Sequence, residues 1–315
     1  MRVALIPTGK LELLGLKPAL DRAFPGHDFH CVPFAGNDPF RSFTSATLPL
    51  ATLHEEDSSL SELIGGIVDQ LYPKPKSDIV FALDDLELRN RGNDAIVVDE
   101  FRLGVARHLE RVKLRNPVDA LNIQQLLRSS ASFHLSAPMI ESWLFADPDG
   151  PANARAPTTH LPPKLIQDRD PEDFETHDQA YSSDTGQCCT GTPPKALPPH
   201  RRTDKTPEWL KADSPRERVK IRREIHPKRY MAWLCRSAEQ RNCSTYSDRT
   251  GAMSLRQIAW GRVLETPTHM RFLRALLFDL ADAIGSPPAG FSLIGDQSDL
   301  TSLRTPRSPR VLRNL

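Results

Sequence analysis

The sequence predicts an α/β fold over roughly its first half, with a parallel sheet covered by helices on both faces. Short apolar runs alternate with segments whose apolar residues recur at helical spacing, the pattern of strands joined by crossover helices. The run at residues 79–83 is apolar at every position, as strands buried on both faces usually are. Acidic residues follow two of the predicted strands, at the edge where open α/β sheets bind ligands.

The first elements of the chain are short and clearly bounded. Residues 2–7 form an apolar run that leads into Pro-Thr-Gly, which predicts a strand followed by a turn. Leucines at helical spacing predict a helix over residues 11–24, and Pro25-Gly26 ends it. Apolar and polar residues alternate over residues 28–34, which predicts the second strand.

The alternation of helices and strands continues to about residue 146. Leucine, isoleucine and valine at helical spacing predict a helix over residues 58–71. The further predicted elements are a strand at 77–83, a helix at 99–112, a short strand at 133–135 and a helix that begins within 138–146.

The composition of the chain changes at about Asp147. Residues 148–213 are rich in Pro, Asp, Thr, Gly and Arg, and such a segment buries too little apolar surface to offset the entropy of ordering. The predicted organisation is an α/β domain at 1–147, a flexible Pro-rich linker or insertion at 148–213, a smaller helical part at 214–286 and a loosely ordered tail at 287–315.

Three helices are predicted in the smaller helical part. The first covers residues 215–236 and is split by Pro227. The second covers residues 253–263. The third covers 267–284, with Thr266 as N-cap, a proline in the first turn and Gly285 as the stop.

The composition also limits the cellular setting. Of the 315 residues, 39% are hydrophobic, and the formal net charge is +1. No apolar run of about 18 residues exists, so no membrane partner is expected. The N-terminal residues lack the layout of a signal peptide, which makes the cytoplasm the expected location. The spacing of the five cysteines fits no zinc pattern.

Carboxylates gather where two predicted strands end. Glu12 follows the first strand, and Asp84, Asp85 and Glu87 follow the strand at residues 77–83. In a parallel sheet these segments emerge at the same edge, where the acids would repel one another unless protonated or neutralised by a cation. Mg²⁺ prefers oxygen ligands, so the sequence predicts a divalent-cation site, and such an ion can polarise a phosphodiester.

These residues resemble the TOPRIM domain, which occurs in topoisomerases, bacterial primases and the OLD-type and related nucleases of phage defence. The resemblance rests on Gly9-Lys10-Leu11-Glu12 after the first strand and on the Asp85-x-Glu87 pair after the third. Three further stretches are similar to a bacterial family of TOPRIM-like proteins of this length: residues 137–147, 226–230 and 246–252.

The resemblance implies a core that binds Mg²⁺ or Mn²⁺. Glu12 would be a general base or metal-linked group, and Asp85 and Glu87 would be the metal-binding pair. Glu87 stands where the family has aspartate, and Asp84 is an alternative to Asp85 in the register. The comparison adds Glu141 as a further candidate ligand, although a carboxylate near a helix N-terminus is also favoured by the helix dipole.

Basic residues supply two further candidate contacts. Lys10 follows a glycine in an incomplete phosphate-loop pattern, and it would touch a phosphate as a point charge. The stretch from residue 200 to 230 is dense in lysine and arginine and indicates either a nucleic-acid surface or a solvated helix face. Its candidate nucleic-acid contacts are Arg222, Arg223, Lys228, Arg229 and Tyr230.

The expected function is a divalent-metal-dependent nuclease that hydrolyses or nicks nucleic acid, with a role in phage defence and a partner ATPase as further expectations. One alternative is a catalytically degenerate TOPRIM-like module that docks a partner protein. A weaker alternative is phosphoryl or nucleotidyl transfer, because a fold does not fix the reaction.

Overall fold

The computed structural model describes residues 1–45, 48, 58–184, 221–237, 243–293 and 310–315, and its sheet confirms the predicted α/β fold. Four parallel strands lie in the order β2-β1-β3-β4, so that β1 and β3 are central and β2 and β4 are edges. The strands are β1 (Arg2–Pro7), β2 (Asp28–Cys31), β3 (Ile79–Asp85) and β4 (Ala131–Ser136).

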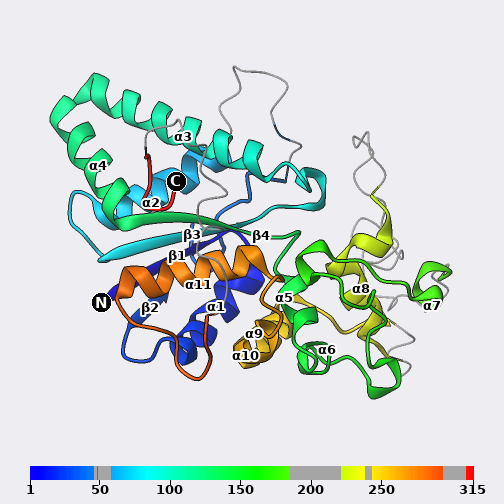
Figure 1. Ribbon diagram of the computed structural model, residues 1–315. Coiled ribbons are helices and arrows are strands. Elements are labelled where there is room, and N and C mark those ends of the chain that lie inside the picture. The colour runs from blue at the N-terminus through cyan, green and yellow to red at the C-terminus, as the bar shows by residue number, and fades with distance from the viewer. Residues whose placement is uncertain (46–47, 49–57, 185–220, 238–242, 294–309) are drawn as a thin grey trace, which may run out of the picture.

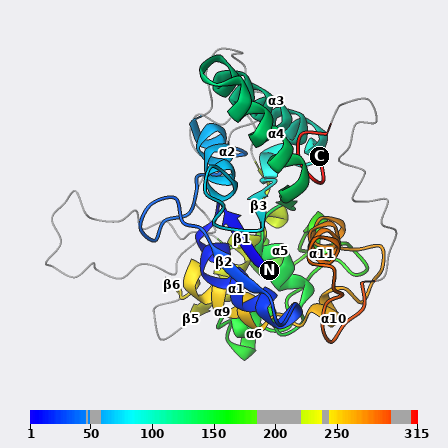
Figure 2. The same ribbon diagram turned by 90° about the vertical axis from the view of Figure 1, so that its left-hand side faces the viewer.

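Helices cover both faces of the sheet. Figure 1 shows α2, α3 and α4 on one side and α1 and α11 on the other, and Figure 2 shows the same division from the side. The helices that flank the sheet are α1 (Lys10–Ala23), α2 (Ser58–Leu71), α3 (Asp94–Arg115), α4 (Pro117–Ser130) and α11 (Arg271–Ile284).

Most of the shorter elements lie beyond the carboxyl ends of the strands (Figure 1). The short helices are α5 (Glu141–Ala146), α6 (Gly150–Asn153), α7 (Gln179–Ser182), α8 (Pro227–Leu234), α9 (Asp248–Gln257) and α10 (Trp260–Val263). The 3₁₀ turns are η1 (Leu88–Asn90), η2 (Thr158–His160), η3 (Pro171–Asp173) and η7 (Arg223–Ile225), and β5 (Arg236–Ser237) pairs with β6 (Cys243–Ser244).

The alternation of side chains along the central strands creates two cores. Val3 and Leu5 of β1 face the core that contains α1, α5, α11 and the helices α8–α10. Ala4 and Ile6 face the core that contains α2, α3 and α4. The helices of the predicted smaller helical part therefore share a core with the sheet.

Two segments are more ordered than their composition suggested. Within the predicted linker, residues 148–184 are packed, and Ala154, Phe174 and Tyr181 are fully buried. Residues 185–213 lie outside the described residues. Within the predicted loose tail, Leu312 and Leu315 are buried in the second core, and residues 294–309 lie outside the described residues. A few well-placed apolar residues fix segments whose average composition is polar.

Helices α1 and α9 approach closely because α1 contains glycine and proline. A Cβ at Gly15 would lie 3.0 Å from the carbonyl oxygen of Ala252, so glycine lets the two backbones meet. Pro18 lies inside α1 and has no N–H to donate to the Leu14 carbonyl. The Arg256 guanidinium of α9 donates to that carbonyl instead, at 2.8 and 3.1 Å. This packing brings the start of α9 to the edge of the sheet where β1 ends.

The last helix begins later than predicted. Thr266 and Pro267 were expected to open it, but α11 begins at Arg271. The N–H groups of Phe272 and Leu273, in the first turn of α11, donate to the Glu172 carboxylate, each at 2.9 Å. A cap from a residue about a hundred positions away fixes this start, and the predicted stop at Gly285 is confirmed by its left-handed conformation.

Among the remaining helices, α8 begins at Pro227, with the 3₁₀ turn η7 just before it. The first part of the predicted helix, residues 215–220, lies outside the described residues. The predicted helix over 253–263 appears as α9 and α10. Among the helices of the described residues, none combines the length and hydropathy that crossing a bilayer requires.

Candidate functional site

The carboxyl ends of β1, β3 and β4 lie side by side at one edge of the sheet. The register places Pro7 beside Leu83, and Asp85 beside Ser136, so the residues that follow the three strands emerge together. Five acidic residues are carried by these segments, and we call them the acid cluster. They are Glu12 in the first turn of α1, Asp84 and Asp85 at the end of β3, Glu87 just after it, and Glu141 at the start of α5.

Asp84 anchors the side of the sheet that carries α2 and α3. Its carboxylate accepts hydrogen bonds from the Thr8 hydroxyl and from the backbone N–H groups of Phe43 (3.2 Å) and Asp85 (2.9 Å). Asp84 is only 1% exposed. Through these hydrogen bonds, the Asp84 carboxylate holds the turn after β1 and the loop at residue 43 against β3.

Asp85 points to the opposite side of the sheet, because successive side chains of a strand alternate. Its Oδ1 accepts hydrogen bonds from the Ser136 hydroxyl and from the Ile140 N–H at 3.0 Å. This is the side that carries α1 and α5. Asp85, and not Asp84, therefore shares a side of the sheet with Glu12.

Glu12 folds back over Gly9, the N-cap residue of α1. A Cβ at residue 9 would lie 2.1 Å from Glu12 Oε2 and 2.6 Å from Oε1. The Gly9 backbone is extended (φ −112°, ψ 152°), which any residue can adopt, so space alone requires glycine here. Glu12 is only 3% exposed, and the positive end of the α1 dipole favours its carboxylate in this position.

We expect the substitution Gly9→Ala to displace the Glu12 carboxylate while leaving the fold intact. The added methyl group occupies the position of the carboxylate, so Mn²⁺ binding should weaken by about tenfold or more, the loss of roughly one ligand interaction. Gly65→Ala is the matched control, because nothing lies within 4 Å of a Cβ there. Equal Mn²⁺ affinities for the two variants in calorimetry would contradict this role for Gly9.

Glu87 is held in a backbone conformation that residues other than glycine rarely adopt. Its φ is 60° and its ψ is 148°. Its N–H donates to the Pro138 carbonyl (2.8 Å), and its carbonyl accepts from the Asn90 N–H (3.1 Å). Such conformations cost on the order of 1–3 kcal/mol and cluster at functional sites. The surrounding hydrogen bonds thus hold a strained acidic residue at the end of β3.

Glu141 is tied to residues from the second half of the chain. Its Oε1 accepts a hydrogen bond from the Tyr246 hydroxyl at 3.0 Å. The Lys228 ammonium lies 3.9 Å from the same oxygen and 3.4 Å from Asp248 Oδ1. The Glu141 side chain is 3% exposed and that of Lys228 is 43% exposed. Lys228 therefore places a positive charge between a buried acid and the solvent.

Burial and mutual repulsion raise the pKa values of the acid cluster. Burial is the main cause for Glu12, whose pKa rises to about 8, and the charge of Glu141 adds to it. Burial and neighbouring acids raise the pKa of Glu87 to about 7. The pKa of Asp85 lies well above its usual range, because Asp85 is buried and faces Glu12 and other acids. Burial raises the pKa of Asp84 less, to about 6, because four hydrogen bonds stabilise its charged form.

These shifts predict an unusual dependence of stability on pH. Glu12 binds its proton more tightly in the folded protein than in the unfolded chain. The stabilisation is therefore complete below pH 4.5, the ordinary pKa, and is lost as the pH rises through about 8. In EDTA we expect the free energy of unfolding to fall by more than about 1 kcal/mol between roughly pH 5 and pH 8.5.

Urea denaturation at several pH values measures this slope. In the variant Glu12→Gln the slope should be shallower, because the amide does not titrate. Stability that stays level or rises with pH in EDTA, in both proteins, would contradict the proposed burial of the cluster.

The acid cluster fits a hard divalent cation by the chemistry of its donors, which are carboxylate oxygens, and by the space that Gly9 leaves for Glu12. Within the described residues, however, no three His, Cys, Asp or Glu side chains converge closely enough to form a metal-binding group as they stand. Mg²⁺ often uses only one or two protein carboxylates together with water and substrate phosphates. The arrangement therefore suits such a site and not a closed protein cage.

Several of the basic residues predicted to contact nucleic acid form ion pairs or hydrogen bonds outside the acid cluster. Lys10 forms an exposed ion pair with Asp38 (3.2 Å). Arg222 is exposed and pairs with Glu175 at 2.8 Å. The Arg223 guanidinium donates to backbone carbonyls and lies 5.5 Å from the centre of the Tyr181 ring.

Tyr230 requires a correction. It is fully buried, its ring stacks with that of Trp233, and its hydroxyl donates to Asp178 at 3.2 Å. A base cannot stack on a ring inside the core. Arg229, on the same helix, is only half-buried, so its burial does not contradict the predicted contact.

Gly9 and Ser136 were not predicted as parts of the site: Gly9 was noted only within the motif Gly9-Lys10-Leu11-Glu12, and Ser136 was not noted at all. Gly9 precedes an acid in a first helical turn, and this spacing is the one local signal that a side chain folds back over it. Ser136 ends β4 and meets Asp85 only through strand pairing, so no local signal exists. Tyr246 was noted only through the resemblance, and its contact with Glu141 spans 105 positions.

Compared with known protein families, curated proteins and solved structures, the chain matches none of them.

Proposed function

We propose that this protein is a divalent-cation-dependent nuclease, which hydrolyses or nicks phosphodiester bonds in nucleic acid. The observation that carries this proposal is the gathering of Glu12, Asp85, Glu87 and Glu141 at the carboxyl edge of a parallel sheet. Evolution rarely keeps several buried, mutually repelling acids without a cation or a proton to neutralise them. The resemblance of Glu12 and the Asp85-x-Glu87 pair to TOPRIM sites supports the same reading.

The residues divide the chemistry among themselves. A bound Mg²⁺ or Mn²⁺ would polarise the phosphodiester and lower the pKa of water. Asp85 and Glu87 would hold the ion, and Glu12 would be linked to it. Glu12, whose burial raises its pKa in the metal-free cluster, would act as a general base or as a group linked to the metal. Lys228 is half-exposed beside Glu141 and offers a positive charge to a phosphate oxygen.

The direct test uses purified full-length protein with plasmid DNA, single-stranded DNA and RNA, in Mg²⁺ or in Mn²⁺. The wild type should cleave or nick at least one substrate, and EDTA should stop it. The double variant Glu12→Gln/Asp85→Asn should be inactive and remain folded by circular dichroism. If the wild type and the double variant are equally inert on every substrate, the nuclease proposal fails.

A second candidate function is a catalytically degenerate module that regulates a partner protein. The specific observation that favours it is the ion pair of Lys228 with Glu141 and Asp248, together with the lack of a three-residue metal group in the described part of the chain. In that case a lysine neutralises the cluster in place of a metal. Such a module would bind no divalent cation through Asp85.

A further inference from the structure

The last described residues of the chain cover the open edge of the sheet. Strand β4 is an edge strand, and edge strands present unpaired N–H and C=O groups to other chains. Residues 310–315, which we call the terminal segment, lie against β4 (Figure 1). The Arg313 N–H donates to the Ala131 carbonyl at 2.8 Å. The Arg128 side chain of α4 donates to the Arg310 carbonyl at 2.7 Å.

Asn314 pairs with β4 as a backbone peptide group would. Its Oδ1 accepts from the Phe133 N–H at 3.1 Å, and its Nδ2 donates to the Phe133 carbonyl at 2.7 Å. A side-chain amide carries one acceptor and two donors, so it can satisfy both backbone groups of one residue. Asn314 thus completes the edge without adding a strand.

Two leucines anchor the terminal segment in the core. Leu312 is 0% exposed and Leu315 is 1% exposed, and both belong to the core that contains α2, α3 and α4. The Leu315 carbonyl accepts from the N–H groups of Val311 and Leu312, at 2.8 and 3.0 Å. The segment therefore closes into a turn that drives both side chains inward.

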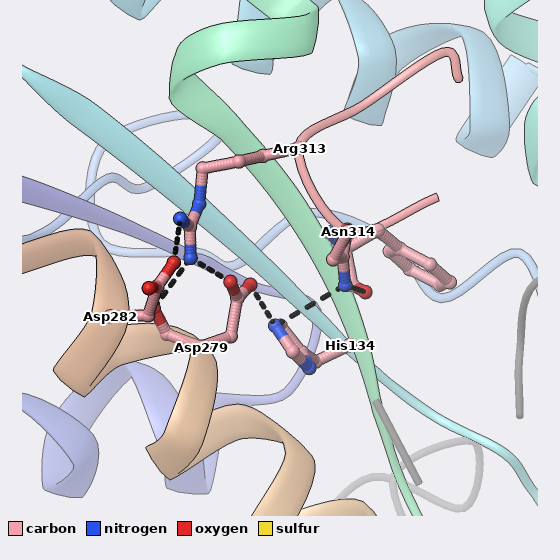
Figure 3. A network of polar contacts seen from close by, with 6 residues as sticks. His134, Asp279, Asp282, Arg313 and Asn314 are labelled. Carbon is pink, nitrogen blue, oxygen red and sulfur yellow. Dashed lines mark hydrogen bonds and ion pairs between the residues drawn. The ribbon is translucent and has the colours of Figure 1, made fainter. Parts of the chain in front are cut away.

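Arg313 reaches across the edge to the other face of the sheet, as Figure 3 shows. Its guanidinium pairs with the Asp279 carboxylate of α11, donates to the Asp279 carbonyl at 2.6 Å, and pairs with Asp282 at 2.7 Å. The second Asp279 oxygen lies 2.9 Å from His134 Nε2. A planar guanidinium held by a buried carboxylate is a selective contact that lysine does not reproduce.

We propose that the β4 edge, together with Asp279 and Asp282, is a peptide-docking site, and that the terminal segment is its ligand within the same chain. Three separate features contact consecutive residues of the segment: the second core encloses Leu312, the α11 carboxylates pair with Arg313, and the Phe133 backbone pairs with Asn314. Strand edges that recognise short segments through backbone pairing and side-chain pockets are a known mode of peptide binding. Release of the segment would open the edge to an extended peptide.

This proposal is independent of the acid cluster. All the contacts of the terminal segment described above are made with β4, α4, α11 and the second core, and none of them involves a cluster residue. A protein without nuclease activity could therefore still carry this docking site, and the test below needs no activity measurement.

The test measures whether the site accepts the segment as a separate peptide. The probe is a fluorescent hexapeptide with the sequence of residues 310–315, added to the full-length wild type and to the full-length double variant Arg313→Ala/Asn314→Ala. In the wild type the attached segment competes at a high effective concentration. We expect the peptide to bind the double variant at least about tenfold more tightly. A probe with alanine at the positions of Arg313 and Asn314 should bind neither protein.

A second readout covers the case in which the double variant folds poorly. Amide hydrogen exchange of Phe133, followed by NMR, should accelerate at least about tenfold in the single variant Asn314→Ala, because its N–H loses its acceptor. Arg310→Ala is the matched control, since that side chain is exposed and only its carbonyl is used. Protection should return when the hexapeptide is added.

Two results would overturn the assignment. The first is equal peptide affinity for the wild type and the double variant, with unchanged protection of Phe133 in Asn314→Ala. The second is a wild-type dimer that dissociates in Asn314→Ala, which would mean that the segment of another copy occupies the edge.

Discussion

Replacing Asp85 by asparagine is expected to lower cation-dependent cleavage by about 10²-fold or more, the size of effect seen when one preorganised electrostatic group is lost. The asparagine Oδ1 can still accept hydrogen bonds from Ser136 and Ile140, so the local structure should survive. What disappears is the negative charge. Rates of plasmid nicking at saturating Mn²⁺ measure the loss.

The matched control for this variant is Asp84→Asn. Asp84 serves as an anchor for Thr8 and Phe43, so its substitution should lower the free energy of unfolding by about 1–3 kcal/mol. At temperatures where both variants are folded, Asp84→Asn should retain much more activity than Asp85→Asn. Equal losses in the two variants would mean that the two aspartates do not have separate roles.

Replacing Lys228 by glutamine should destabilise the protein in EDTA by about 1–2 kcal/mol. Removing one partner of a buried ion pair usually costs more, but the 43% exposure of the Lys228 side chain reduces the effect. The loss of stability arises because buried Glu141 loses its nearby cation, while the other acids of the cluster remain beside it. Millimolar Mn²⁺ should restore most of the stability, since a divalent cation can replace the lost charge.

Lys10→Gln provides the comparison for Lys228. Lys10 belongs to an exposed ion pair with Asp38, and such pairs contribute at most about 1 kcal/mol. Thermal unfolding of both variants, with EDTA and with Mn²⁺, separates the two cases. A Lys228→Gln protein as stable as Lys10→Gln in EDTA would contradict the neutralising role of Lys228.

The sheet and the position of its acids could be predicted because both depend on local patterns. Apolar runs define β1 and β3, and parallel topology places their carboxyl ends together, so Glu12 and Asp85 were expected at one edge. The choice between Asp84 and Asp85 required the direction of each side chain. One position along a strand reverses that direction, and the sequence pattern alone did not specify which face each acid would meet.

The remaining features depend on contacts between distant positions. The start of α11 is set by Glu172, and local signals at Thr266 and Pro267 misplaced it. Helix α4 was not predicted, because its buried residues are few and Val118 and Leu121 on it are exposed. Its one clear signal is Asn116 before Pro117, an N-cap followed by a first-turn proline.

Lys228 shows the same limit at the site itself. In the sequence it belongs to a basic stretch, which indicates contact with a nucleic-acid backbone. In the structure its ammonium lies beside Glu141, because α8 packs against α5 in the shared core. A lysine that the sequence assigned to a nucleic-acid surface is thus a neighbour of the acid cluster.

The central claim is that the acid cluster binds a divalent cation through Asp85, and calorimetric titration with Mn²⁺ tests it most directly. The full-length wild type should bind one Mn²⁺ per chain at the cluster. Asp85→Asn should weaken this binding by about tenfold or more, whereas Asp84→Asn should leave it nearly unchanged. Absence of binding to the folded wild type, or binding that Asp85→Asn does not alter, would contradict the claim.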